Sequence, residues 1–119
     1  MSSLLLTILL QATAGDMTIA QAEALARRDE ATLQGETSSR FFAGQDKAVG
    51  RAMVACGVNA AQEMAGIKVV MLLDEHGQVE RTWLNSPSEL GKCFAAKLGS
   101  EAFQTDGRSK FYTFVNFNF

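Results

Sequence analysis

The segment Ile67-Lys68-Val69-Val70-Met71-Leu72-Leu73 decides the fold of this chain. Apart from Lys68 it is apolar at both alternating sets of positions, which is typical of a central strand covered on both faces. Asp74-Glu75-His76-Gly77 follows, and its final glycine predicts a tight turn that needs a positive φ. Residues 79–84 then return as a more polar partner strand. The stretch therefore predicts a β-hairpin whose first strand lies in the middle of a sheet.

A helix and a last strand follow the hairpin. Ser86 as N-cap, Pro87 at the first helical position and Glu89 closing a capping box predict a helix that continues to Leu98. Residues 111–119 alternate in the manner of a strand, and one face carries Phe111, Thr113, Val115, Phe117 and Phe119. We therefore expect an α+β fold with a three-stranded antiparallel sheet, its hairpin's first strand in the centre and helices packed on one face.

One or two further helices are predicted upstream of the hairpin. The first spans residues 18–33, where Thr18 and Gln21 have the spacing of a capping box. Residues 35–44 are polar apart from a pair of phenylalanines and are interpreted as a linker. The second helix spans about residues 46–56, and its core-facing positions are Val49, Met53 and Cys56.

Length and composition favour a single packed domain. The chain has 119 residues, of which 47% are hydrophobic and 20% charged, so it is long enough to bury one core. Its formal net charge is -2, and the basic residues are scattered. No broad basic surface is therefore predicted, and we expect no nucleic acid among the partners.

The N-terminal fourteen residues differ in character from the rest. Leu4–Leu10 is apolar apart from Thr7, and Ala12-Thr13-Ala14 has the small-x-small pattern of a cleavage site. These features predict a secretory signal peptide at residues 1–14, although no Lys or Arg precedes the apolar run. The run is too short to span a bilayer, so no stable membrane insertion is expected after processing. The alternative is a buried N-terminal element of a cytoplasmic protein.

No residue pattern indicates a catalytic site, a metal site or a cofactor. His76 is the single histidine and lies in the predicted turn, without a nucleophile and an orienting group at suggestive spacing. The two cysteines and this histidine lack the spacing of a zinc site. The glycines do not form a phosphate-binding loop. We therefore expect a protein that is not an enzyme.

The second half of the chain resembles the C-terminal domain of TonB-type proteins, most of all the AgmX/PglI C-terminal branch. The resemblance covers about residues 45–119, after a helix-and-linker region at residues 15–44. It rests on the order of elements and on matching positions, namely Cys56, Gly77, Val79, Ser86, Cys93, Phe117 and Phe119. An aromatic-proline pair expected after the last helix is absent, since Ala102-Phe103-Gln104 stands there. The resemblance implies protein binding by strand addition at a sheet edge.

Two cysteines on separate predicted helices form one disulfide if the chain is exported. A bridge between Cys56 and Cys93 would require Cα atoms about 4.4–6.8 Å apart. Both helices must then pack side by side on one face of the sheet. In a cytosolic chain the same residues would be two buried thiols.

Two functions remain open at this point. The first is a periplasmic protein-interaction module, whose better acceptor for a partner strand is predicted to be the edge formed by Phe111, Thr113, Val115, Phe117 and Phe119. The second is a small periplasmic inhibitor or immunity protein that blocks an enzyme or toxin through the acidic turn at Asp74, Glu75 and His76. An ordered protruding loop would favour the inhibitor, and a bare sheet edge would favour strand addition.

Overall fold

Three longer helices and three strands make up residues 16–118, the part of the chain that the computed structural model describes. The predicted signal peptide at residues 1–14 and the last residue, Phe119, lie outside it. In chain order the elements are α2 (Ile19–Glu30), α3 (Gly35–Ala55), the short 3₁₀ helix η2 (Ala61–Met64), β1 (Lys68–Leu73), β2 (Val79–Leu84), α4 (Glu89–Gly99) and β3 (Phe111–Asn116). No helix within residues 16–118 is long and apolar enough to cross a membrane.

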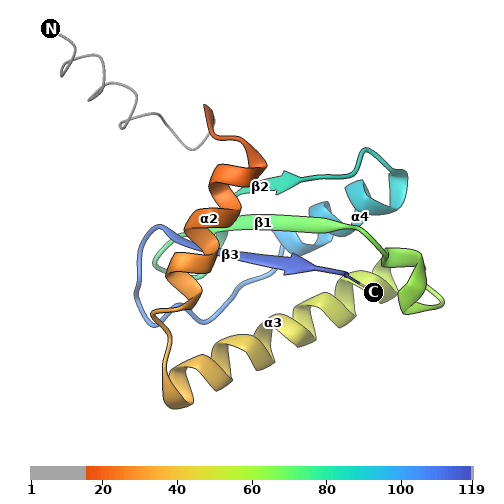
Figure 1. Cartoon of the computed structure of the whole chain (residues 1–119). Coiled ribbons are helices and arrows are strands. Elements are labelled where there is room, and N and C mark those ends of the chain that lie inside the picture. The colour runs from red at the N-terminus through yellow and green to blue at the C-terminus, as the bar shows by residue number, and fades with distance from the viewer. Residues whose placement is uncertain (1–15, 119) are drawn as a thin grey trace, which may run out of the picture.

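The strands form one open antiparallel sheet in the order β2-β1-β3 (Figure 1). The central residue Val70 pairs with Trp83 of β2 on one side and with Phe114 of β3 on the other. The predicted topology is therefore confirmed, with the hairpin's first strand in the centre. The connection from β2 through α4 to β3 passes over β1, as the sequence predicted.

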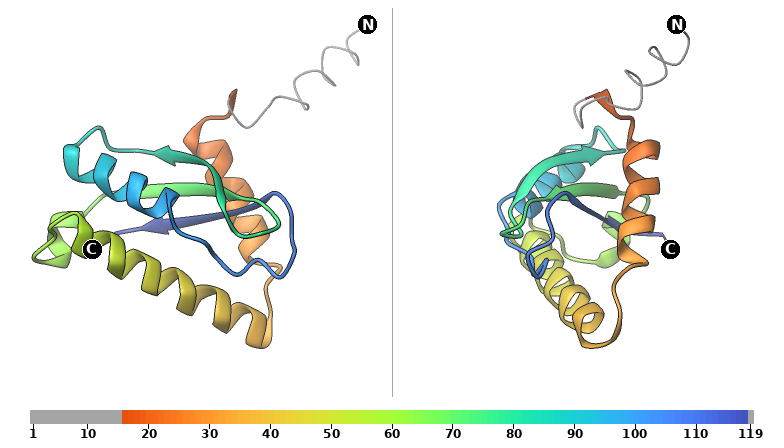
Figure 2. Two further views of the ribbon diagram at one scale, coloured as in Figure 1. Left: turned by 180° about the vertical axis from the view of Figure 1, so that it is seen from behind. Right: turned by 90° about the vertical axis from the view of Figure 1, so that its left-hand side faces the viewer.

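Both faces of β1 are covered, which explains why every residue of the strand after Lys68 is apolar. Val69, Met71 and Leu73 face a core shared with α3 and α4, and Val70 and Leu72 face a second core beneath α2. Figure 2 shows α2 on one side of the sheet and the other two helices on the opposite side. Burial of both alternations is the expected consequence of period-two geometry in a strand that has helices on each face.

The helix α2 crosses the strands, from β2 past β1 to the outer side of β3 (Figure 1). It begins as predicted, because the Thr18 hydroxyl accepts from Gln21 N–H while the Gln21 side chain accepts from Thr18 N–H. Only the small residues Ala22 and Ala26 are fully buried on it. Small side chains let the helix lie close to the sheet, so α2 packs over a thin second core.

The predicted linker at residues 35–44 was wrong, and so was a domain boundary at residue 45. A single 21-residue helix, α3, runs through both. Phe41 is buried, and Gln45, Ala48 and Ala52 continue the same stripe along the helix axis. Residues 35–40 are polar because the start of α3 faces solvent. They contain no proline, so nothing in them interrupts the helix.

The start of α4 was predicted two residues too early. Ser88 is the N-cap, since its hydroxyl accepts from Gly91 N–H at 3.0 Å. Ser86 instead supports Ser88, whose N–H donates to the Ser86 hydroxyl. Pro87 therefore precedes the cap and does not occupy the first helical position. Glu89 is then the first helical residue and closes no capping box, so that part of the prediction was wrong too.

The predicted bridge between Cys56 and Cys93 is present, with Cα atoms 5.9 Å apart. Cys56 is the C-cap of α3, and Cys93 lies in the middle of α4. The bridge joins the two helices that share one face of the sheet. It therefore fixes the end of α3 to the layer that covers the main core.

Candidate functional site: the two edges of the sheet

The outer edge of β3 is formed by different residues from those that the sequence predicted. Phe117 and Ile67 continue the pairing with β1, since Phe117 N–H donates to Ile67 C=O at 3.0 Å. By alternation, the backbone groups of Phe111, Thr113 and Val115 also face β1. The side chains of these three residues pack into the main core or lie fully buried. The backbone groups on the outer edge belong to the alternate set, namely Tyr112, Phe114 and Asn116.

Two carboxylates at the end of α2 occupy this edge. Tyr112 N–H donates to Asp29 Oδ2 at 2.9 Å, and Phe114 N–H donates to Glu30 Oε2 at 3.1 Å. An incoming strand would offer carbonyl oxygens to the same two amides. The first half of the β3 edge is therefore already paired within the chain, which is a recognised form of edge protection.

A buried polar relay holds one of these carboxylates in place. Thr113 is fully buried, and its hydroxyl donates to Glu30 Oε2 at 2.5 Å while accepting from Gln45 Nε2 at 2.8 Å. The relay thus joins α2, β3 and α3 around the edge. Burial raises the pKa of Glu30 above its ordinary value, although the bonds from Thr113 and Phe114 act in the opposite direction. The charged form of Glu30 is therefore disfavoured in the folded chain by its burial.

This arrangement predicts a pH-dependent effect of Glu30→Gln. The folded chain holds a proton on Glu30 more tightly than the unfolded chain, so wild-type stability rises as the pH falls through the raised folded pKa. The glutamine variant keeps an acceptor oxygen and lacks this titration. We expect the difference in unfolding free energy, variant minus wild type, to be largest at neutral pH and to shrink on acidification. Urea titrations at several pH values measure it, and a difference that does not vary with pH would contradict the assignment.

The outer edge of β2 is organised differently. Asn85 N–H donates to Lys68 C=O at 3.2 Å, so these two residues are a hydrogen-bonded pair between β1 and β2. By alternation Trp83 and Arg81 pair with β1, and the backbone groups of Thr82 and Leu84 point outward. No side chain within residues 16–118 caps these outward groups. This edge therefore presents the hydrogen-bonding pattern that a further strand requires.

A bulge restricts where a partner strand could pair with β2. The register shifts between Leu72 and Leu73, so Glu80 is the extra residue on β2. Bulges disrupt ladder geometry locally and protect an edge. The first half of β2 is therefore a poor acceptor, and the regular segment from Arg81 to Leu84 is the part that can accept a strand.

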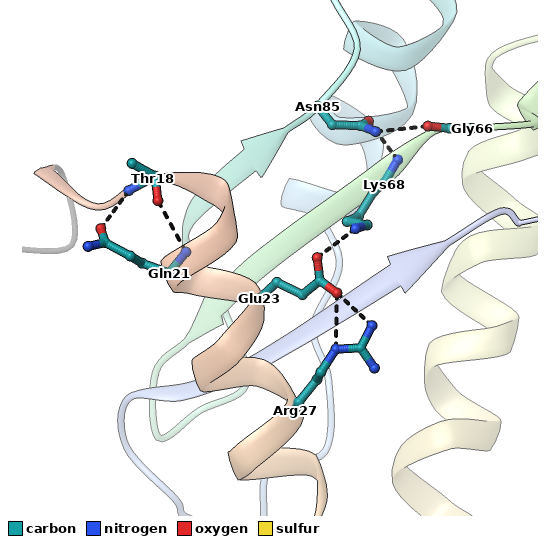
Figure 3. A network of polar contacts seen from close by, with 7 residues as sticks. All are labelled: Thr18, Gln21, Glu23, Arg27, Gly66, Lys68 and Asn85. Atoms are coloured by element: carbon teal, nitrogen blue, oxygen red, sulfur yellow. Dashed lines mark hydrogen bonds and ion pairs between the residues drawn. The ribbon is translucent and has the colours of Figure 1, made fainter.

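Polar contacts fix the ends of β1 and β2 relative to α2 (Figure 3). Lys68 Nζ lies 2.6 Å from Glu23 Oε1, and Arg27 bonds to the other oxygen of the same carboxylate. The bonds from Lys68 and then Arg27 hold the pKa of Glu23 below its ordinary value. Asn85 links the strand ends, since its side chain accepts from Lys68 N–H and donates to Gly66 C=O. The end of β2 next to its open segment is thus tied to the start of β1 by side-chain hydrogen bonds.

The acidic hairpin turn is docked against the body of the protein. The Asp74 carboxylate accepts from the N–H groups of His76 and Gln78, so it stabilises its own turn. The Thr105 hydroxyl lies 3.4 Å from the carbonyl oxygens of Asp74 and Glu75. Of the predicted inhibitory residues, Glu75 and His76 are exposed and Asp74 is half-buried, and His76 Nε2 lies 3.6 Å from Glu75 Oε1. The turn is ordered but does not form a protruding loop.

No group of three metal-ligating side chains comes together within residues 16–118. The shifted carboxyl pKa values have local structural causes. The hydrogen bond from Arg51 lowers the pKa of Glu101, and the hydrogen bond from Lys68 lowers the pKa of Glu23. Burial raises the pKa of Glu30. None of these three shifts is caused by a second carboxylate.

The edge carboxylates Asp29 and Glu30 were not predicted as site residues. In the sequence Asp29 only interrupts an apolar stripe. One signal was available in the sequence. Two adjacent acidic residues at a helix C-terminus are unfavourable, because that end of the helix dipole is already negative. Such a placement indicates that the carboxylates have donors outside their own helix, and here those donors are the edge amides of β3.

No family model, curated protein or solved structure matches this chain. The resemblance to TonB C-terminal domains therefore stays a prediction, carried by the residues named above.

Proposed function

We propose that this chain is a non-enzymatic periplasmic protein-interaction module that binds a partner by adding a partner strand to the outer edge of β2. The outward-facing backbone of Thr82 and Leu84 carries the proposal, because it offers donors and acceptors at the spacing that a strand needs. Main-chain bonds supply affinity in this mode, and side-chain pockets supply specificity. The open three-stranded sheet supports it, since only a closed barrel has no edges.

The choice of β2 over β3 follows from the occupancy of the two edges. A strand added along Tyr112 and Phe114 would have to displace Asp29 and Glu30, and with them the buried bonds of Thr113. Leaving such buried polar groups unsatisfied costs about 1–3 kcal/mol each. At the β2 edge, no carboxylate within residues 16–118 occupies the outward amides of Thr82 and Leu84.

The proposed compartment rests on two features that agree. The disulfide between Cys56 and Cys93 suits an oxidising environment. The apolar run at Leu4–Leu10 with Ala12-Thr13-Ala14 suits export. Together with the TonB-like pattern of elements, they support a cell-envelope role.

The inhibitor alternative has weaker support. It needs a turn that enters an enzyme's cleft, whereas the turn at residues 74–77 lies against Phe103 and Thr105. Its first acidic group, Asp74, is already bonded to backbone amides. Strand addition uses groups that are free of such bonds.

Quantitative capture with matched edge variants tests the proposal. Thr82→Pro removes the outward N–H without breaking a bond to β1, which is where proline is tolerated in an edge strand. Thr82→Ala removes the same side chain and keeps the N–H. We expect mass spectrometry of captures from an envelope extract of the source organism to show a partner retained by wild type and Thr82→Ala and lost by Thr82→Pro. Equal retention by Thr82→Pro, at unchanged thermal stability, would refute addition at β2.

A further inference from the structure

The two edges of the sheet differ in a way that bears on how copies of this chain meet. Two carboxylates of α2 already bond to outward amides of β3. At β2, the outward amides of Thr82 and Leu84 have no carboxylate on them within residues 16–118. A regular, uncapped edge of this kind pairs readily with another strand, including the same strand of a second molecule. The chain therefore has one edge that is suited to pairing with its own copy.

A two-fold axis between two antiparallel β2 strands restricts which residues meet. The residue on the axis lies opposite its own symmetry mate, and its neighbours pair in reverse order. An axis at Arg81 would set two arginines directly opposite each other, which is unfavourable. An axis at Trp83 would pair Arg81 with Asn85, which lies beyond the end of β2. An axis at Thr82 keeps the pairs within β2.

The pairs produced by an axis at Thr82 suit an antiparallel ladder. Thr82 exchanges two backbone hydrogen bonds with its mate, and opposed threonines are a favourable cross-strand pair. Arg81 lies opposite Trp83 of the second copy. Its guanidinium already lies over the Trp83 ring of its own chain, 5.4 Å from the centroid, so it can contact an aromatic ring on each side. Glu80 meets Leu84, so no like charges lie directly opposite each other.

A glycine of α4 lies beside the same axis. The helix packs against β2, and a Cβ atom added at Gly99 would meet only Cγ2 of Thr82, at 3.9 Å. Gly99 is helical and has no positive φ, so neither packing nor backbone conformation within the chain demands glycine there. With the axis perpendicular to the sheet, the C-terminal ends of two α4 helices lie side by side on one face. A residue without a side chain lets them approach closely.

We propose that two copies of this chain pair through their β2 edges about a two-fold axis at Thr82, so that two three-stranded sheets become one. This pairing rests on the proposed function, because it uses the same open edge. The ladder is short, and small contacts of this kind are weak and reversible. Below its dissociation constant the chain is a monomer whose β2 edge is open to a partner strand. Because the β3 edge is capped, assembly stops at two copies.

Sedimentation equilibrium of the full disulfide-bonded chain over a range of concentrations tests the pairing. Wild type should pass reversibly from monomer to dimer. Thr82→Pro removes both hydrogen bonds at the axis and should weaken dimerisation by about tenfold or more. Thr82→Ala keeps the N–H and should still dimerise. A wild type that stays monomeric at its highest soluble concentration, a dimer unaffected by Thr82→Pro, or a mass that grows beyond the dimer would overturn the proposal.

Gly99→Gln distinguishes a second copy from a lone partner strand. Its side chain fills the space between the two α4 helices, so dimerisation should weaken by about tenfold or more. The melting temperature should not fall, because glutamine is a better helix former than glycine. Lys97→Gln is the matched control, since it lies two positions away on the opposite side of the helix and should leave the dimer unchanged. A dimer that survives Gly99→Gln would contradict the axis at Thr82.

The same variants separate this pairing from the proposed function. Gly99→Gln should still retain the captured partner, because a lone strand brings no α4 helix. If wild type forms no dimer while Thr82→Pro still loses the captured partner, the pairing of copies is refuted and strand addition stands. If Thr82→Pro loses the dimer but retains the captured partner, the pairing of copies is supported and strand addition by that partner is refuted.

Discussion

Replacing Cys93 by serine is expected to lower the free energy of unfolding by about 2–5 kcal/mol under oxidising conditions. The bridge joins residues 37 apart in sequence. A closed loop of that size removes chain entropy from the unfolded state worth roughly 3.9 kcal/mol in the loop-entropy treatment. Since domains of this size have total stabilities of about 5–15 kcal/mol, the loss is a large share. Chemical denaturation followed by circular dichroism measures it.

The double variant Cys56→Ser/Cys93→Ser is the appropriate companion, because it leaves no free thiol to cross-link two chains. In the presence of a reductant, wild type and variants should differ little, since both cysteines are only half-buried. A wild type whose stability does not change on reduction would show that the bridge is not formed or does not stabilise the fold. It would also remove the main support for an oxidising compartment.

Gly77→Ala is expected to cost about 3 kcal/mol or more. Gly77 has φ +78°, a region that costs other residues roughly 1–2 kcal/mol. An added Cβ would also lie 1.6 Å from the Phe103 carbonyl oxygen, so the backbone must move. Overpacking of this kind costs about 1–3 kcal/mol more. The shift would break the bond of 2.8 Å from Phe103 N–H to Gly77 C=O.

Gly107→Ala provides a matched control for this effect. Gly107 has φ +79°, but nothing lies within 4 Å of its added Cβ. Its substitution should cost about 1–2 kcal/mol through backbone conformation alone. Equal losses in the two variants, measured by urea denaturation, would show that contact between the hairpin turn and Phe103 is unimportant.

The sheet could be predicted because its signals are local. The apolar run of β1, the turn glycine and the alternation of β3 each lie within a few residues, and period-two patterns specify which faces are buried. The start of α2 was also predictable, since Thr18 and Gln21 satisfy each other within one turn. The disulfide could be predicted on the condition that the chain is exported, because the chain has only two cysteines.

The continuity of α3 could not be predicted in the same way. Residues 35–44 have weak helical patterning, and their conformation depends on Phe41, which packs against Phe111 of β3 with ring centroids 5.3 Å apart. Tertiary packing decides the conformation of such a segment. The edge carboxylates were missed for a related reason, because Asp29 and Glu30 find their donors more than 80 residues away.

Amide hydrogen exchange of the chain, free and bound to its captured partner, tests strand addition most directly. In the free chain the amides of Thr82 and Leu84 should exchange fast, because they face outward from β2. Partner binding should slow both by about tenfold or more, as expected when an edge amide enters a ladder, and leave Tyr112 and Phe114 unchanged. Protection confined to Glu75 and His76, or to the amides of β3, with none at Thr82 and Leu84, would contradict addition at the β2 edge.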